Sequence, residues 1–139
     1  MIRRWVLPIA AFLFVAGAGG LLVVLFGIVP IKASSGHWPI TSRILEFAMR
    51  RSIATYTLGM EVPPLDGRGL LLVGASHYEI GCRPCHGSPE LRRPRITGRM
   101  TPPPPYLPST IATWQPDELF YIVKHGVKFT GMPGWPALQ

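Results

Sequence analysis

The sequence predicts an all-α protein with one N-terminal membrane-spanning helix and a small helical domain. The run from Trp5 to Ile31 has no charged residue and, as a helix, would be roughly 40 Å long, enough to cross a bilayer. Helical signals mark Thr41 to Tyr56 and Pro116 to His125, and no segment alternates convincingly as a half-buried strand does. The chain is therefore divided into an anchor, a linker with an amphipathic interfacial helix, and a domain, at residues 1–32, 33–63 and 64–139.

The charges beside the apolar run predict which way the anchor crosses the membrane. Arg3 and Arg4 precede the run, and Lys32 follows it. By the positive-inside rule the N-terminus lies in the cytoplasm and the chain after Lys32 lies on the far side. We therefore expect a single-pass protein of a bacterial inner membrane, with lipid around its anchor and its domain on the periplasmic side.

A cleaved signal peptide is the alternative interpretation of the same segment. Arg3 and Arg4 would form its basic region, and Ala16-Gly17-Ala18 resembles a small-residue cleavage site. A signal peptide has only about 7–15 apolar residues, whereas Leu21 to Ile31 continues the run beyond that site. The anchor is favoured, and both interpretations export the rest of the chain.

The formal net charge of +7 and the sequence pI of about 10.1 raise the question of an acidic partner. Export argues against nucleic acid, and no aromatic residues are interleaved with the most basic stretch. That stretch contains Arg92, Arg93, Arg95 and Arg99. These charges either provide solubility and attraction to a membrane surface or steer an acidic partner protein.

The segment from Thr41 to Tyr56 predicts an amphipathic helix just outside the span. Its apolar face would contain Ile44, Leu45, Ala48, Met49 and Ile53. Its polar face would contain Arg43, Glu46 and Arg50, while Phe47 and Arg51 depart from the pattern. Such a helix either lies in the membrane interface, docks on a partner subunit, or packs on its own domain.

The domain begins at Pro63-Pro64, because the second proline prevents a helix from continuing through the first. Asp66 to Ile80 is predicted to form a helix that leads into Cys82. Gly87 to Ser109 is rich in proline and arginine, and its run Pro102 to Pro105 favours extended polyproline geometry. We therefore expect a loop there.

The best-marked helix is Pro116 to His125. Proline occupies its first turn, and Asp117 and Glu118 follow at the positive end of the helix dipole. Lys124 and His125 lie at the negative end of the dipole, and Gly126 is expected to end the helix.

The two cysteines occur in Cys82-Arg83-Pro84-Cys85-His86, the pattern C-x-x-C-H. Thiols three positions apart can each form a thioether with one porphyrin vinyl group, and the adjacent histidine is then held beneath the iron. A thioredoxin-like dithiol belongs in a βαβ setting, and a zinc ribbon needs a second ligand pair; this chain has neither. The motif therefore predicts one covalent haem c.

Met132 is the candidate sixth ligand of the iron, because methionine thioether is a usual distal ligand and raises the reduction potential. It lies in Gly131-Met132-Pro133-Gly134-Trp135, where glycine and proline fix a loop. His125 is the main competitor, and bis-histidine ligation would lower the potential. The other methionines, Met49, Met60 and Met100, are expected to serve packing or the surface.

With these motifs the chain resembles a small monohaem class I cytochrome c, over about residues 64–139. The matching residues are Gly74-x-x-x-Tyr78, CxxCH-Gly at Cys82 to Gly87, the helix end from Leu119 to Gly126, and Gly-Met-Pro-x-Trp at 131 to 135. The resemblance implies a few helices wrapped around haem, attachment at Cys82 and Cys85, His86 as proximal ligand and Met132 as distal ligand.

Two further expectations concern the surroundings of the haem. A metal-bound histidine gives its other ring N–H to an acceptor, and in this fold a loop carbonyl serves; we expect one among Thr101 to Pro105. Trp114 and Trp135 either shield the haem edge, approach a propionate through the indole N–H, or fill the core.

Similar cytochromes end with a further helix that crosses the helix containing Gly74 and Tyr78. The chain stops seven residues after Met132, so the notch at Gly74 and the Tyr78 ring would lack a partner. We expect either that the chain is a fragment, with the domain incomplete at its C-terminus, or that a neighbouring subunit covers this side.

The function predicted from these residues and this resemblance is one-electron transfer without bond-making catalysis. The donor would be a quinol-oxidising complex or a periplasmic dehydrogenase, and the acceptor a terminal oxidase. One alternative is a haem peroxidase, which needs an open or loosely held distal position. Another is a membrane-anchored assembly subunit, for which Ala16 and Gly20 offer a small-residue contact within the span.

Overall fold

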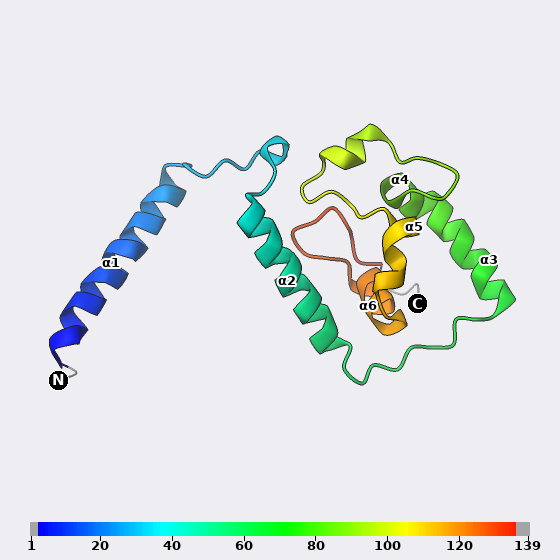
Figure 1. Cartoon of the computed structure of the whole chain (residues 1–139), viewed down its shortest axis with the longest axis horizontal. Helices are drawn as coiled ribbons and strands as arrows, with labels where there is room; N and C mark the ends of the chain where they lie inside the picture. Colours follow the sequence, from blue (N-terminus) through cyan, green and yellow to red (C-terminus); the bar gives the residue numbers. More distant parts are fainter. Residues whose placement is uncertain (1–2, 136–139) are drawn as a thin grey trace. The chain divides into compact units, whose positions relative to one another are not determined.

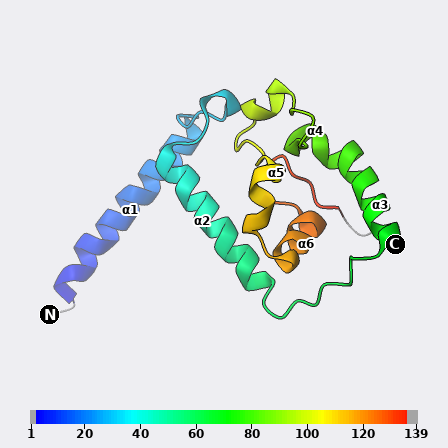
Figure 2. The same ribbon diagram turned by 45° about the vertical axis from the view of Figure 1, so that its right-hand side comes forward.

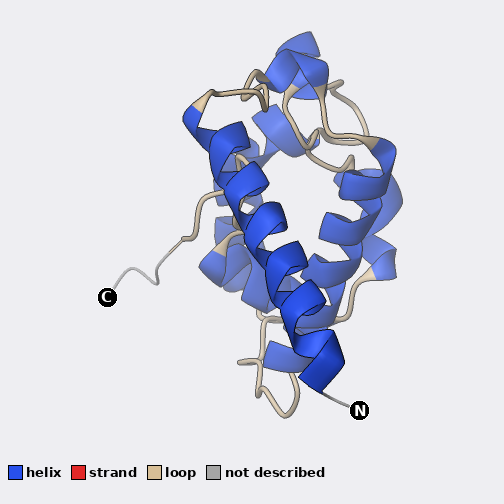
Figure 3. Cartoon of the chain, turned by 90° about the vertical axis from the view of Figure 1, so that its left-hand side faces the viewer, coloured by secondary structure: helices blue, strands red, loops and turns tan. Residues whose placement is uncertain are grey.

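A computed structural model describes residues 3–135 of the chain. The chain separates into two compact units, Met1–Lys32 and Ala33–Gln139. Residues 3–135 contain helices and loops and no strand (Figure 3). The predicted all-α class is therefore confirmed.

The first unit consists of α1, Arg3–Leu25, which is the only helix among the described residues that is long and apolar enough to cross a membrane. It ends before Ile31 because Gly27, at φ 60°, adopts the left-handed conformation that closes a helix. The Ile28 N–H donates to the Val23 carbonyl (3.1 Å), and the Gly27 N–H donates to the Val24 carbonyl (3.1 Å). By length and composition α1 could be a membrane anchor or a signal sequence.

The first α-helix of the second unit is α2, Pro39–Tyr56, which starts slightly earlier than predicted because Pro39 fits the first turn of a helix. Only part of the apolar face expected for this helix is buried within the unit. Ile53 is buried, at 5% exposed, but Ile44 is 59% exposed and Leu45 is 40% exposed. Polar residues take part in the packed face instead, since Thr57, directly after the helix, is 4% exposed.

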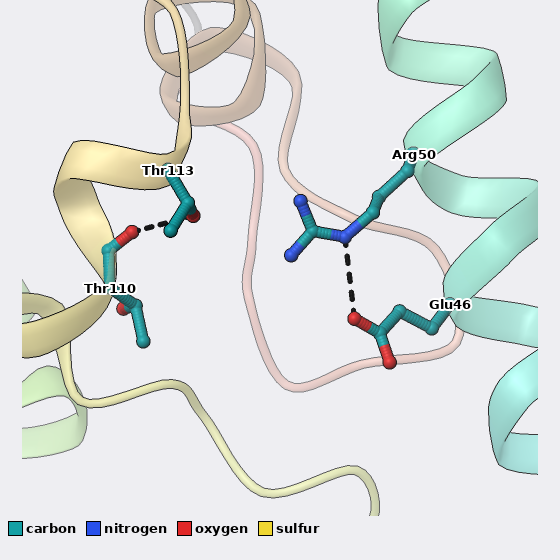
Figure 4. A network of polar contacts seen from close by, with 4 residues as sticks. All are labelled: Glu46, Arg50, Thr110 and Thr113. Atoms are coloured by element: carbon teal, nitrogen blue, oxygen red, sulfur yellow. Dashed lines mark hydrogen bonds and ion pairs between the residues drawn. The ribbon is translucent and has the colours of Figure 1, made fainter.

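Aromatic and cation–π contacts explain which side of α2 packs within the unit. The helix packs on α6, Pro116–His125, and the rings of Tyr56 and Tyr121 stack with centroids 6.0 Å apart. The Arg50 guanidinium lies 4.4 Å from the centre of the Trp114 ring. Its Nε is held by Glu46 at 3.3 Å, and the group extends toward the segment with Thr110 and Thr113 (Figure 4).

The predicted helix before the cysteines is present and continues further than expected. α3, Arg68–His77, passes into a π-helical turn, Tyr78–Cys82, and then into α4, Arg83–His86. A π turn contains an extra residue and so rotates the next helical segment about the axis; such turns are frequent at functional sites. The whole C-x-x-C-H motif is thus helical.

The expected loop after residue 87 contains short helical pieces. They are a 3₁₀ turn, Arg95–Arg99, then α5, Leu107–Thr110, and a second 3₁₀ turn, Ile111–Thr113. α6 has the predicted bounds, and the Glu118 carboxylate accepts the Gln115 N–H at 2.9 Å, which caps its first turn. Within the second unit, α5 and α6 lie between α2 and the α3–α4 segment (Figures 1 and 2).

Replacing Ile53 by alanine tests the packing of α2 on α6. Because Ile53 is buried at this contact, we expect Ile53→Ala to lower the free energy of unfolding of the haem-loaded protein by roughly 2–4 kcal/mol. Denaturant titration followed by circular dichroism measures the change. Leu58→Ala is the control, since Leu58 is 81% exposed, and it should shift stability by less than about 0.5 kcal/mol. Equal effects of the two changes would contradict this packing.

Candidate haem site

Both cysteines are presented by one short helical segment. Cys82 and Cys85 are three positions apart, so on a helix they face the same side. Both thiols are free and half-buried, and His86 follows directly as the last residue of α4. The side chains predicted to attach and coordinate haem are therefore adjacent on one helical turn.

The chain leaves this turn through Gly87, where only glycine fits. Its φ of 75° and ψ of 178° lie in a region essentially closed to residues with a Cβ. A Cβ there would also lie 2.6 Å from Cε2 of Tyr106. The Tyr106 ring thus packs directly on the backbone after His86, which explains the glycine that follows the C-x-x-C-H motif.

Two tyrosine hydroxyls hold the carbonyls just beyond His86. Tyr78 donates to the Gly87 carbonyl at 2.5 Å, and Tyr106 donates to the Ser88 carbonyl at 2.9 Å. The hydroxyl of Tyr78 therefore has a partner within the domain, while the expectation that its ring packs against a further helix stays a prediction. Gly74 does remain open, since no described residue outside its own helix would come within 4 Å of a Cβ there.

The ring of His86 is oriented by a hydrogen bond to the proline-rich loop. Its Nδ1 lies 3.0 Å from the Pro105 carbonyl, so Nδ1 carries the proton and donates. The expected acceptor among residues 101–105 is therefore found, and it is Pro105. The Arg93 guanidinium donates to the neighbouring Pro104 carbonyl and holds this loop. Nε2 is left as the nitrogen available to a metal.

Burial and neighbouring groups raise the pKa of two side chains at the site. Burial, with a smaller contribution from Cys85, raises the pKa of the Cys82 thiol. Burial, followed by the charges of Cys82, Glu79 and Tyr106, raises the pKa of Tyr78. At neutral pH Tyr78 is therefore protonated and able to donate to the Gly87 carbonyl.

The loop with Met132 is built on the C-terminus of α6. The Val127 N–H donates to the Met132 carbonyl at 3.3 Å, and the Trp135 N–H donates to the Val123 carbonyl at 3.4 Å. Gly126, at φ 68° and ψ −169°, is again in a glycine-only region. A Cβ at Gly126 would lie 2.5 Å from the backbone N of Gly134, so the returning loop lies directly on the helix end.

Two contacts connect the Met132 loop with earlier parts of the domain. A Cβ at Gly81 would lie 3.2 Å from the Trp135 ring, so this ring packs beside the residue that precedes Cys82. The methyl group of Met100 packs against Gly131, next to Met132. Met100 thus has the packing role that was expected of it.

The competing ligand His125 is the last residue of α6, and its ring packs against a residue of the same helix. Its side chain is exposed, and its ring is 4.6 Å from the Tyr121 ring, which itself stacks on Tyr56 of α2. This contact occupies one face of the His125 ring. Met132 is half-buried in a loop of fixed backbone, which suits a ligand better.

The described residues fit a haem group in two respects. Cys82, Cys85 and His86 lie on one helical turn, with Nε2 of His86 left available to a metal. In addition, Ile53 is the only apolar side chain that is buried among residues 3–135. A large flat apolar group would therefore complete the core of the domain.

A family model described as "Cytochrome C oxidase, cbb3-type, subunit III" matches residues 70–139, half of the chain. The chain belongs to this cytochrome c family. Membership implies a role in electron transfer, and the cysteines of the cytochrome c domain fit the attachment motif of haem c. Searches of the curated proteins and of the solved structures found no match.

Sequence reasoning missed two residues that shape this cytochrome c domain. Tyr106 packs on Gly87 and bonds to Ser88, and its only signal was an aromatic residue at the end of the proline run. Gly126 was predicted solely as a helix stop, but it also lies under the Met132 loop. The signal for that contact was the set of glycines on both sides of Met132.

Replacing Gly126 by alanine tests the support of the Met132 loop. The backbone conformation alone should cost roughly 1–3 kcal/mol, and the overlap with the loop backbone adds to it. We expect Gly126→Ala to lower the unfolding temperature of the haem-loaded protein. Gly69→Ala is the matched control because nothing lies within 4 Å of a Cβ at Gly69. An unchanged unfolding temperature in the Gly126 variant would show that the loop does not lie on the helix end.

Proposed function

We propose that this chain carries single electrons through one covalent haem c, with His86 as proximal ligand and Met132 as distal ligand. The observation that carries the proposal is the helical Cys82–His86 turn, in which the His86 ring is already oriented by the Pro105 carbonyl. A ring fixed before the metal binds needs little reorganisation afterwards. Membership of the cytochrome c family supports the same role.

The two thiols attach the group without any change of oxidation state. Each thiol adds across one vinyl group, so that sulfur bonds to one carbon and the thiol hydrogen is taken up by the other. Cys82 and Cys85 are half-buried and free, as this addition requires. Haem iron, when bound, supplies the one-electron redox couple.

The chain's own residues determine what kind of haem site this is. His86 and Met132 would both hold the iron as its protein ligands and leave no vacant position for a substrate, which favours electron transfer over peroxidase chemistry. Thioether ligation raises the reduction potential. The loop on Gly126 and the packing of Trp135 on Gly81 support a Met132 that is held in place.

The electron acceptor in this proposal is a terminal oxidase, and the donor is a quinol-oxidising complex or a periplasmic dehydrogenase. The family description, which names an oxidase subunit, supports association with an oxidase. Three arginines of the basic stretch are exposed and can steer an acidic partner: Arg92, Arg95 and Arg99. Whether the domain is a fixed oxidase subunit or a tethered carrier, the electron path is the same.

In this proposal α1 is retained as a single-pass anchor in a bacterial inner membrane, and the haem domain lies in the periplasm. Arg3 and Arg4 at its start support the orientation by the positive-inside rule. The apolar run also continues beyond Leu25 to Ile31, longer than a signal peptide needs.

Replacing Met132 tests the distal ligand. We expect Met132→Ala to abolish the weak red absorption band of sulfur-to-iron coordination in the oxidised protein. It should also lower the reduction potential by on the order of 0.1 V, a fraction of the roughly 0.8 V that axial ligands span. The open position should allow the reduced protein to bind carbon monoxide.

Met60→Ala and His125→Ala are the controls for this experiment, and both should leave the band and the potential unchanged. Loss of ligation in the His125 variant alone would replace the His/Met assignment by a bis-histidine one. Rapid binding of carbon monoxide or peroxide by the unaltered protein would favour the peroxidase alternative.

The mass and location of the mature protein test the anchor. We expect an intact mass that includes residues 1–32 and one haem, and a protein that stays in the membrane after an alkaline carbonate wash. Protease added to spheroplasts should digest the haem domain without permeabilisation. A mature N-terminus just after Ala18 and release by the wash would instead identify a cleaved signal peptide.

A further inference from the structure

The outward face of α2 has a stripe of large apolar side chains. Ile40, Ile44 and Phe47 are four and three positions apart, so they line one side of the helix. They are 62%, 59% and 68% exposed, and Trp38, directly before the helix, is 78% exposed. We refer to Ile40, Ile44 and Phe47 as the outer stripe.

The outer stripe lies on the side of α2 that faces away from the domain. Ile53, which is buried against the rest of the unit, is nine positions after Ile44, and nine residues turn an α-helix by two and a half turns. The two residues therefore point in opposite directions. The face with Ile53 also includes Arg50, which lies over Trp114. α2 thus has one face that packs on its own domain and a second, apolar face that is directed outward.

Only a short linker separates the anchor from α2 in the sequence. Ala33–Ser35 forms a tight 3₁₀ turn, closed by the Gly36 N–H donating to the Ala33 carbonyl at 3.1 Å. The Thr101 hydroxyl donates to the same carbonyl at 2.6 Å. From Ala33 to Pro39 even a fully extended chain could span only about 20 Å. The outer stripe therefore begins within a short distance of the point where an anchored chain leaves the bilayer.

The residues beside the outer stripe suit the headgroup region of a membrane. Trp38 precedes the helix, and tryptophan is enriched at membrane–water interfaces. Arg43 flanks the stripe, and Arg51 continues it one turn beyond Phe47; both are exposed. Long basic side chains can place their apolar stems along the stripe and their charges at lipid phosphates.

We propose that the outer stripe of α2 lies in the interface of the bilayer, at the boundary of headgroups and acyl chains, with Arg43 and Arg51 at the phosphates. This inference rests on the anchor in the proposed function. Lipid fits better than a protein partner because three side chains form a strip much smaller than the roughly 20–30 residues per side of a stable protein interface. The stripe is also continuous in sequence with the anchor.

The test uses single cysteines in the full-length, haem-loaded protein. Ile44→Cys and Phe47→Cys place a thiol in the outer stripe, and Ser52→Cys places one at an exposed position of the same helix outside it. Each variant is inserted into nanodiscs of phosphatidylcholine and phosphatidylglycerol at one copy per disc. The rate of reaction with a charged maleimide is then measured relative to the rate in denaturant. An unchanged haem spectrum confirms that each variant is folded.

We expect the two stripe variants to react at least tenfold more slowly than the Ser52 variant in nanodiscs. Equal rates would overturn the inference. Protection that occurs in native membranes but not in nanodiscs would also overturn it and identify a protein partner, since one copy per disc excludes self-association. The protein without an added cysteine should not react at all. Its reaction would contradict haem attachment at Cys82 and Cys85, independently of where the stripe lies.

Discussion

The constraint on which the rest of this domain depends is its shortage of apolar core. Among residues 3–135 Ile53 is the only buried apolar side chain, and no side chain is fully buried. Hydrophobic burial is the main favourable contribution to folding, so helices as short as α3 and α4 cannot be stable through contacts of this kind alone. A porphyrin attached at Cys82 and Cys85 would provide the missing apolar surface. In this view the haem is as much a structural element as a redox group.

With so little core, the residues proposed as ligands have to be positioned mainly by the backbone. On the proximal side the Tyr78 and Tyr106 hydroxyls bind consecutive carbonyls after His86, and the Pro105 carbonyl fixes the imidazole. On the distal side the returning loop lies directly on Gly126, without a side chain between them. Both arrangements need a glycine at a conformation that other residues avoid. Hydrogen bonds and close backbone contacts therefore position these residues, as side-chain packing does in larger domains.

Features encoded locally could be predicted from the sequence, and features set by distant contacts could not. α6 was predicted correctly because its capping residues are adjacent in the chain, whereas the helical form of the C-x-x-C-H segment was not predicted. The part of α2 that packs within the unit could not be derived from an apolar pattern, because Arg50 lies over Trp114 and Thr57 is buried. The acceptor of the His86 hydrogen bond could be predicted only to within five residues. The folded loop determines that Pro105 provides the carbonyl.

α6 joins α2 to the loop that contains Met132. On one side its Tyr121 stacks on Tyr56 of α2, and at its end the Met132 loop is bound through Val123 and Gly126. The orientation of α2 and the position of Met132 are therefore linked by a single short helix. If lipid fixes the outer face of α2, as proposed, it also orients the part of the domain that contains Met132. Because electron transfer falls steeply with distance, such an orientation would favour a partner that lies in the same membrane.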